Sequence, residues 1–359
     1  MITITNKINS IVASRPKQMY GWPGVVKIAE NEILVSASER RFHCCPFGRE
    51  VVIRSLDGGQ SWGLPQEVYN SELDDRDASL AIMPDGTLVL GWFTSSYFEA
   101  HWKEHGSRIS QKMRDDLIGT WMCTSKDNGH NWENPQRIPV GSHISPIALS
   151  DGSLISIGEE QGNDTSLAVY KSGDLGESWE RTGEIKCQRL WCEKSQSNEL
   201  LFNENHVLET SPGNLIAMLR SEPAGDGYLY QSFSEDNGIN WTIPHKTDMF
   251  GCPPHLLLLD NGAIMCSYSY RHEPFSVRAV FSYDEGKTWD TDNIQTIYEW
   301  EDEPDMGYPS SIELSPGKIL TVFYCNRRDI WSAKKFIDLN LPESLPEGIL
   351  SVTFNYTMR

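Results

Sequence analysis

The sequence predicts an all-β protein, a six-bladed β-propeller, and two internal repeats carry this prediction. The first repeat reads Ser-x-Asp-x-Gly-x-x-Trp and is called the Asp box below; its five copies begin at Ser55, Ser125, Ser172, Ser234 and Ser282. The second repeat is a pair of apolar runs joined by a turn that contains Gly or Asn, and it occurs six times. Regular self-similarity of this kind is typical of radial repeat folds.

Each blade is expected to begin with one of the apolar pairs, because alternating apolar residues on both sides of a turn predict a β-hairpin. The six hairpins begin at Val25, Leu80, Pro146, His206, His255 and Ser311. Five are followed by an Asp box and the sixth is not. We therefore expect residues near Phe336–Ile337, and a terminal segment such as Ile2–Ile4 or Val352–Tyr356, to complete the last blade and close the ring.

The fixed residues of the Asp box have structural tasks in a tight turn. The Gly supplies a positive φ, the Asp carboxylate accepts hydrogen bonds from N–H groups of the turn, and the Trp packs against the neighbouring sheet. The boxes are therefore expected to stabilise the blades rather than to take part in chemistry.

Length and composition narrow the possible functions. A closed ring of repeats predicts one domain over residues 1–359, although 359 residues would otherwise suggest two or three domains. The formal charge of −19 argues against nucleic acid and anionic membranes as partners. No basic stretch followed by an apolar run opens the chain, so we expect a cytoplasmic location, with a trimmed secreted form left open. The eight cysteines form no CxxC pair and are expected to be mostly buried.

Strand direction predicts which side chains meet. If the first strand of each blade runs down from an upper face and the second returns, residues before the first strand and after the second lie together near the axis. In blade order these positions hold residues 20–22 with Glu39, Arg40 and Arg41; Arg76 and Asp77; His143 with Glu159 and Glu160; Glu204, His206 and Arg220; His255 and Arg271; and Asp305 and Tyr308 with Arg327; Trp22 belongs to the first of these sets. A ring so rich in His, Arg and carboxylates favours a functional polar site over an inert axis.

At these positions the chain resembles the sialidase (neuraminidase) superfamily, whose six-bladed propellers carry Asp boxes. The resemblance implies that Asp77 is the acid/base, that Tyr308 is the nucleophile and that Glu204 takes its proton. It implies that Arg220 and a second arginine hold the substrate carboxylate; Arg271 is the better candidate for the second and Arg278 the other. No cofactor is implied, and carbohydrate is the expected partner.

One position departs from the family pattern. The first family arginine lies in a Phe/Tyr-Arg-Ile-Pro motif, and the matching segment here, residues 20–23, reads Tyr-Gly-Trp-Pro, with Gly21 in the place of the arginine. Arg40, Arg41 or Arg76 could supply the missing charge. Together with Trp22 and the histidines His143, His206 and His255, this departure indicates a site adapted to another sugar.

Three functions are therefore kept open. The first is a glycoside hydrolase that acts on an acidic or decorated terminal sugar. The second is a uronate polysaccharide lyase, in which Arg neutralises the uronate and His or Tyr removes the C5 proton. The third is a carbohydrate-binding propeller without turnover. A zinc site built from the three histidines has no motif spacing to support it, so no metal is expected. The oligomeric state is left open.

An insertion in the second blade, residues 94–117, follows the second strand and is expected on the upper face. Its charge and aromatic content, with a single Gly and no Pro, predict a partly helical loop. It could cover the site and stack sugars on Tyr97, Phe98 or Trp102, or it could be an oligomer contact.

Overall fold

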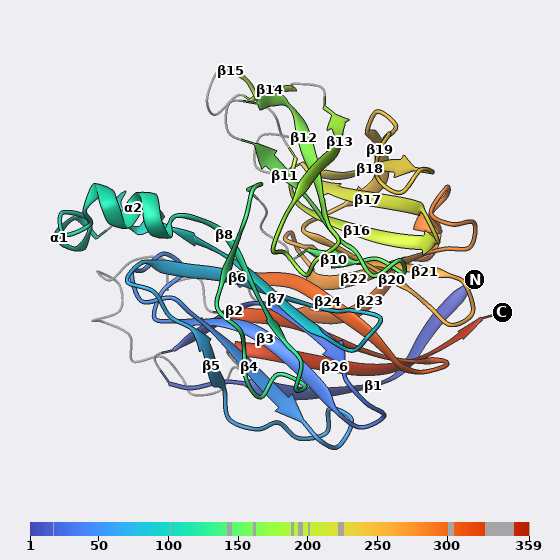
Figure 1. The fold of residues 1–359 in the computed structure, drawn as a ribbon. Coiled ribbons are helices and arrows are strands. Elements are labelled where there is room, and N and C mark those ends of the chain that lie inside the picture. The colour runs from blue at the N-terminus through green and yellow to red at the C-terminus, as the bar shows by residue number, and fades with distance from the viewer. Residues whose placement is uncertain are drawn as a thin grey trace.

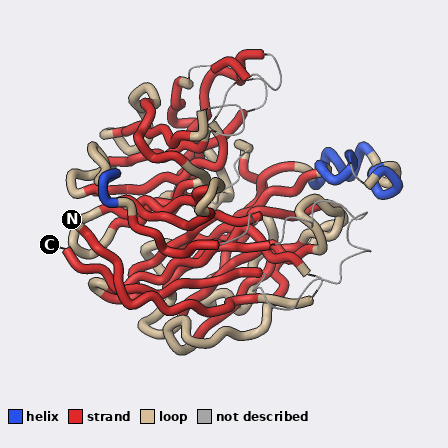
Figure 2. Tube along the Cα trace, turned by 180° about the vertical axis from the view of Figure 1, so that it is seen from behind, coloured by secondary structure: helices blue, strands red, loops and turns tan. Residues whose placement is uncertain are grey.

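The fold is described from a computed structural model. The residues that it describes are 1–16, 18–100, 102–141, 146–160, 163–187, 190–192, 197–199, 202–221, 226–300, 305–326 and 348–358. Figure 1 shows six antiparallel sheets arranged around one axis, and this confirms the predicted six-bladed propeller. Nearly all of the regular structure is strand, with a few short helical segments at the periphery (Figure 2).

Each of the first three blades is a four-stranded sheet in chain order. Blade 1 contains β2 (Met19–Lys27), β3 (Ile33–Arg40), β4 (Arg49–Ser55) and β5 (Gln66–Tyr69). Blade 2 contains β6 (Asp74–Ile82), β7 (Leu88–Ser95), β8 (Gly119–Ser125) and β9 (Gln136–Ile138). Blade 3 contains β10 (Ile147–Ala148), β11 (Leu154–Glu160), β12 (Asn163–Ser172) and β13 (Glu180–Lys186).

The next two blades repeat this arrangement. Blade 4 contains β16 (Asn203–Ser211), β17 (Asn214–Arg220), β18 (Tyr228–Ser234) and β19 (His245–Phe250). Blade 5 contains β20 (Pro254–Leu258), β21 (Ile264–Tyr270), β22 (Phe275–Ser282) and β23 (Gln295–Trp300). A separate hairpin between blades 3 and 4 consists of β14 (Leu190–Cys192) and β15 (Ser197–Glu199).

Blade 6 joins the two ends of the chain. Its strands are β24 (Asp305–Ser315), β25 (Lys318–Asn326), β26 (Gly348–Met358) and, outermost, β1 (Ile2–Ala13). Both terminal segments thus take part, where the sequence suggested one of them together with residues near Phe336–Ile337; the latter lie outside the described residues. The two ends of the chain lie side by side in both views (Figures 1 and 2).

The remaining elements are short helices. Between β7 and β8 lie η1 (Tyr97–Ala100), α1 (Lys103–Gly106) and α2 (Gln111–Leu117), and η2 (Thr291–Asn293) precedes β23. Helices α1 and α2 project from the end of the ring opposite to the chain termini (Figure 1). Among the described residues, no helix is long and apolar enough to cross a membrane.

The Asp boxes fasten each blade to the one before it. In the second box, the Asp127 carboxylate accepts hydrogen bonds from Ser125 Oγ at 2.8 Å and from the backbone N–H of Asn131 at 2.9 Å. Gly129 has φ +78°, and a Cβ there would lie 2.8 Å from Cδ2 of Leu34 in blade 1. The other four boxes make the same turn against a side chain of the preceding blade, and the first box contacts blade 6. The repeats therefore stabilise the ring on its lower face, away from the upper face where first strands begin.

Candidate active site

Four first strands share one backbone irregularity at the upper face. Trp22, Asp77, Glu204 and Tyr308 have φ values of 52°, 63°, 47° and 53°, and the register with the second strand shifts at each of these places. A β-bulge of this kind re-aims a side chain, and a non-glycine residue at positive φ is costly unless its surroundings hold it there. The same device thus presents one side chain from each of blades 1, 2, 4 and 6.

These side chains surround a common space on the axis. A cavity of about 60 Å³ is lined by Trp22, Asp77 and Tyr308 together with His206 and His255 from blades 4 and 5. Five of the upper-face positions predicted from strand direction therefore line one space at the axis. The entrance of blade 3, which holds His143, lies outside the described residues.

Tyr308, Glu204 and Arg220 form one hydrogen-bonded group. The Tyr308 hydroxyl donates to Oε1 of Glu204 at 2.5 Å, and Arg220 donates to Tyr308 Oη at 3.2 Å and to the other oxygen of Glu204. Burial and then the Glu204 charge raise the pKa of Tyr308 well above its usual value, while Arg220 and Arg271 act to lower it. The phenol is therefore neutral near pH 7, with its proton directed at a carboxylate that can accept it.

Arg271, at the end of the second strand of blade 5, lies beside this group. Its guanidinium carbon is 6.0 Å from the centroid of the Tyr308 ring. Within the described part of the chain its Nε has no hydrogen-bond partner, and no carboxylate forms an ion pair with it. Arg278 lies on the third strand of the blade, where its Nε donates to Ser276 Oγ at 3.0 Å and its guanidinium stacks on Tyr270 at 3.4 Å. Of the two candidates, Arg271 is the one placed at the axis.

Asp77 faces Tyr308 from blade 2, next to an aromatic and guanidinium cluster. Its charge is close enough to act on the Tyr308 pKa, and its Oδ1 lies 3.8 Å from Nε of Arg76. Arg76 and Arg40 both stack on the Trp22 ring, at 4.6 and 4.7 Å from its centroid. Trp22 thus occupies the blade 1 position at the axis, with two guanidiniums against it.

The three candidate replacements for the missing arginine differ in their positions. Arg76 reaches the axial residues and is also paired with Asp74, at 3.6 Å. Arg40 is fully buried and donates to Oδ1 of Asp74 at 2.5 Å and to the carbonyl of Asp75 at 2.7 Å, so substrate cannot reach it. Arg41 is exposed and lies 5.9 Å from the Phe47 ring, away from the axis.

His206 and His255 are packed together beneath the upper face. Their ring centroids are 4.3 Å apart, and Nδ1 of His206 accepts a hydrogen bond from the backbone N–H of Leu256 at 3.3 Å. Burial lowers the pKa of His206 to about 4, and burial together with His206 lowers that of His255. Both imidazoles are therefore neutral near pH 7 and cannot bind an anion as cations.

Sequence reasoning missed His43, whose partner Asp305 it had placed on the upper face, and a group of buried carboxylates. Nδ1 of His43 lies 2.8 Å from Oδ2 of Asp305, and the Tyr324 hydroxyl donates to the other Asp305 oxygen at 2.9 Å. The His43 ring contacts Trp22 edge-on, with centroids 5.2 Å apart. Burial acts to raise the pKa of Asp305, but the His43 contact lowers it overall. The position of His43, just after Arg40 and Arg41, was a usable signal, because the loop that follows the second strand lies on the same face.

The second missed group is a set of carboxylates beneath Arg40 and Arg76. Glu50 and Asp75 are both buried, and burial raises the pKa of each, to about 7 for Asp75. Asp75 accepts hydrogen bonds from the Thr94 hydroxyl at 2.6 Å and from the backbone N–H of Ser71 at 2.6 Å. The run Asp-Asp-Arg-Asp at residues 74–77, directly before an apolar strand, was the sequence signal for it.

The insertion is packed against blade 1. Phe98 is buried, Tyr97 is 64% exposed, and Trp102 donates from Nε1 to the carbonyl of Cys44 at 3.0 Å. Trp102 also packs against Phe42, with ring centroids 5.4 Å apart. Among the described residues, no three His, Cys, Asp or Glu side chains are grouped as metal ligands would be.

Comparisons with known proteins agree with this architecture. The family model described as "BNR repeat-like domain" matches residues 47–321. A curated relative, "Sialidase" of Paraclostridium sordellii, is 24% identical over 218 residues, which are 53% of this chain and 48% of the relative. The chain thus spans about half the length of the curated relative that it matches.

Solved structures share the fold at low identity. A protein of unknown function from Dyadobacter fermentans has a TM-score of 0.76 at 20% identity, with 99% of each chain covered. The Hadza microbial sialidase Hz136 has a TM-score of 0.65 at 16% identity, covering 94% of this chain and 65% of the other. The intramolecular trans-sialidase of Ruminococcus gnavus has a TM-score of 0.61 at 13% identity, covering 94% of both chains.

Proposed function

The chain belongs to the family of BNR repeat-like domains and has the sialidase-like propeller fold, and on this premise we propose that it is a glycosidase acting on an acidic terminal sugar residue. The observation that carries the proposal is the 2.5 Å hydrogen bond from the Tyr308 hydroxyl to Glu204, beside the Arg271 guanidinium, which forms no ion pair with a carboxylate among the described residues. A nucleophile, a base and an anion-binding group then lie within one site.

The proposed reaction uses Tyr308 as the nucleophile. An anomeric carbon next to a carboxylate repels an anionic nucleophile, whereas a neutral phenol can attack while its proton passes to Glu204. The raised pKa of Tyr308 keeps the phenol protonated until that moment, and Arg220 stabilises the charge that develops on the phenol oxygen. The first step forms a Tyr308–sugar bond and breaks the glycosidic bond.

Asp77 is the proposed acid/base. It faces the Tyr308 group from blade 2, and in the proposed reaction it gives a proton to the departing oxygen and then takes one from the water that attacks the intermediate. Two inversions at the anomeric carbon lead to retention. Arg271 and Arg220 are the proposed partners of the substrate carboxylate, because guanidinium groups match carboxylates in charge and geometry.

The lyase alternative has weaker support. It needs a base that can remove the C5 proton, and the two described axial histidines have lowered pKa values, about 4 for His206, which makes them weak bases. They line the small axial cavity together with Tyr308. The binding-only alternative is motivated by Trp22, which fills the blade 1 position at the axis, and it is decided by the following experiment.

The test is a panel of aryl sialosides, aryl uronides and neutral aryl glycosides, followed by phenol release and by the ultraviolet absorbance of unsaturated uronate. We expect phenol release from an acidic substrate, and Tyr308→Phe should lower kcat by at least roughly a thousandfold while sugar binding stays within a few-fold. Tyr298→Phe, on the outermost strand of blade 5, is the matched control and should leave kcat unchanged.

Two results would overturn the proposal. Unsaturated product would identify a lyase. Tight binding of an acidic sugar without phenol release from any substrate would identify a binding module.

A further inference from the structure

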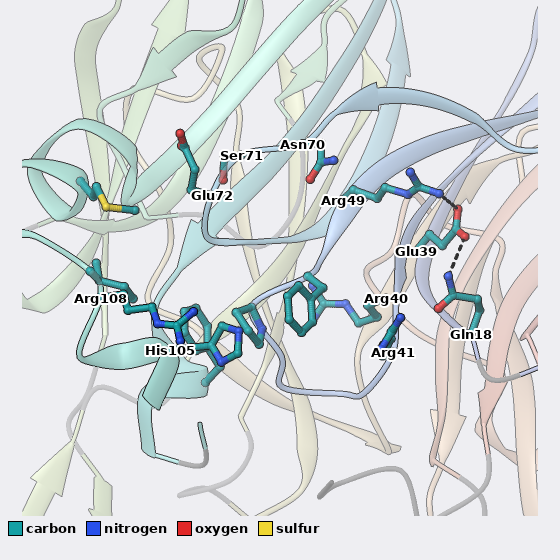
Figure 3. A pocket seen from close by; sticks show the side chains of 15 residues that line it. Gln18, Glu39, Arg40, Arg41, Arg49, Asn70, Ser71, Glu72, His105 and Arg108 are labelled. Carbon is teal, nitrogen blue, oxygen red and sulfur yellow. Dashed lines mark hydrogen bonds and ion pairs between the residues drawn. The ribbon is translucent and has the colours of Figure 1, made fainter. Parts of the chain in front are cut away.

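A second cavity lies on the upper face between blade 1 and the insertion. Its volume is about 540 Å³, against about 60 Å³ for the axial cavity. Figure 3 shows Arg108 and His105 of the insertion on one side, Arg40 and Arg41 on another, and Asn70, Ser71 and Glu72 along a third. None of Asp77, Glu204, Tyr308, Arg220 and Arg271 lines it, so it is a separate space.

Arg40 links this cavity to the axial site, because it lines the cavity and contacts Trp22, which lines the axial cavity. Its guanidinium stacks on Trp22 and pairs with Asp74. Because Asp74 also pairs with Arg76, which lies beside Asp77, the cavity is on the blade 2 side of the axial site.

Two arginines give the cavity a local positive charge that is unusual for this chain. Arg41 and Arg108 are exposed, come from separate segments, and have no ion pair with any residue that the structure describes. The two buried charges of the lining, by contrast, are paired: Glu39 with Arg49 at 3.1 Å, and Arg40 with Asp74. In a protein with a formal charge of −19, two guanidiniums that face one cavity and form no ion pair within the described part of the chain favour an anionic ligand.

The same cavity offers an aromatic surface and neutral polar groups. Phe47 is 45% exposed and packs edge-on against His105, with ring centroids 5.3 Å apart. Gln18, Asn70 and Ser71 supply amide and hydroxyl groups to the lining. A ring with one apolar face, several hydroxyl groups and an acidic substituent matches all three features, and a pocket of several hundred Å³ suits a ligand of that size.

We propose that this cavity binds an acidic sugar residue, with its carboxylate or sulfate against Arg41 and Arg108 and its apolar face against Phe47. The choice of a saccharide rests on the proposed function. The acidic residue has two possible sources, the leaving part of the glycan that is cleaved at the axis and a separate glycan chain. Glu72 is the exposed carboxylate of the lining, and its negative charge weakens the binding of an anion. Removing that charge should therefore strengthen the binding of an acidic sugar.

The test compares 3′-sulfolactose with lactose, which differ only in the sulfate, by calorimetric titration of the full chain at low salt. We expect wild-type protein to bind 3′-sulfolactose at least roughly tenfold more tightly, a difference that falls with added salt. The double variant R41Q/R108Q should abolish the difference, and Glu72→Gln should increase it. Lys112→Gln, which removes a positive charge from the same insertion at a site 82% exposed and outside the cavity, should change nothing.

The outcomes separate this proposal from the proposed function. Equal binding of the two sugars by wild-type protein would overturn it, and so would a loss of the difference in Arg271→Gln rather than in R41Q/R108Q. These titrations need no turnover, so they stand even if no substrate is cleaved. Where turnover is measured, a KM that rises in R41Q/R108Q only for substrates with a sulfated leaving group identifies the leaving part as the source, and an unchanged KM identifies a separate chain.

Discussion

Asp75 makes the folded state sensitive to pH in a direction that can be worked out from its surroundings. Burial is the main cause that raises its pKa from 3.8 to about 7, against the lowering effect of hydrogen bonds from Thr94 and Ser71. Between these two pH values the folded protein holds a proton on Asp75 that the unfolded chain has lost. The free energy of unfolding therefore decreases as the pH rises from about 4 through 7.

The magnitude follows from the size of the shift. About three pKa units at 1.36 kcal/mol each correspond to about 4 kcal/mol in total, of which about 3 kcal/mol is lost between pH 5 and pH 8. Replacing Asp75 with Asn removes the titration. The Asn NH₂ group meets a donor, because both carboxylate oxygens accept hydrogen bonds, and this costs about 1 to 3 kcal/mol at every pH.

The assay is urea unfolding followed by tryptophan fluorescence at pH 5, 6, 7 and 8 and constant ionic strength. The buried histidines act in the opposite direction, since His206 has its pKa lowered to about 4 and its contribution to stability is lost as the pH falls. The readout is therefore the difference between Asp75→Asn and wild type at each pH. That difference should shift in favour of the variant by about 3 kcal/mol from pH 5 to pH 8.

The control is Asp248→Asn, an exposed position on the outermost strand of blade 4, which should run parallel to wild type. If Asp75→Asn also runs parallel to wild type over this range, Asp75 is ionised in the folded protein, and the description of the buried carboxylates under Arg40 and Arg76 is wrong.

Three further predictions concern the site and the ring. Glu204→Gln should lower kcat by roughly a hundredfold or more with little change in sugar binding, because Gln cannot take the Tyr308 proton; phenol release measures this, and a loss confined to binding would contradict it. Arg271→Gln should raise KM for acidic substrates by roughly tenfold or more and leave neutral ones unaffected, as the loss of a charged hydrogen bond predicts; equal effects on both would count against a carboxylate clamp. Gly286→Ala should lower the midpoint of thermal unfolding more than Gly262→Ala does. Both glycines have φ near +85°, but only a Cβ at Gly286 would meet a neighbour, Cδ1 of Ile216 at 2.5 Å. Equal losses would show that backbone strain alone causes the effect.

The fold was predictable because its repeats are turns and hairpins, whose structure is determined by residues close together in sequence. Each Asp box combines a residue at positive φ, a carboxylate that caps the turn and an aromatic side chain that packs on the sheet, and each hairpin alternates apolar and polar residues. One copy of either repeat is weak evidence for a propeller, whereas the whole series is specific for it. The direction of the strands then placed Asp77, Glu204 and Tyr308 on one face without any contact being known. Pairing between the chain ends was less predictable, because Ile2–Ala13 and Gly348–Met358 are equally good candidates for an outer strand by pattern alone.

The finer features of the site depend on tertiary packing. Asp74 pairs with both Arg40 and Arg76, and only the structure shows that Arg76 is the one beside Asp77. The Asp305–His43 pair joins blade 6 to blade 1, which are far apart in sequence. The cavity beside the insertion lies where that segment meets blade 1, to which Trp102 is hydrogen-bonded. The pattern of apolar and polar residues along the chain does not predict such contacts between distant segments.

Because the same bulge recurs in four blades, evolution can change the residues that it presents at the axis while the fold is kept. One backbone kink recurs in four blades and holds an indole, two different carboxylates and a phenol, so a single codon change at any of them alters the reagent while the surrounding β-structure is kept. Few residue types are tolerated at these positions, because residues branched at Cβ rarely adopt a positive φ. We therefore expect related propellers with other activities to carry acidic, amide or aromatic residues at these four bulge positions, while their strands are kept.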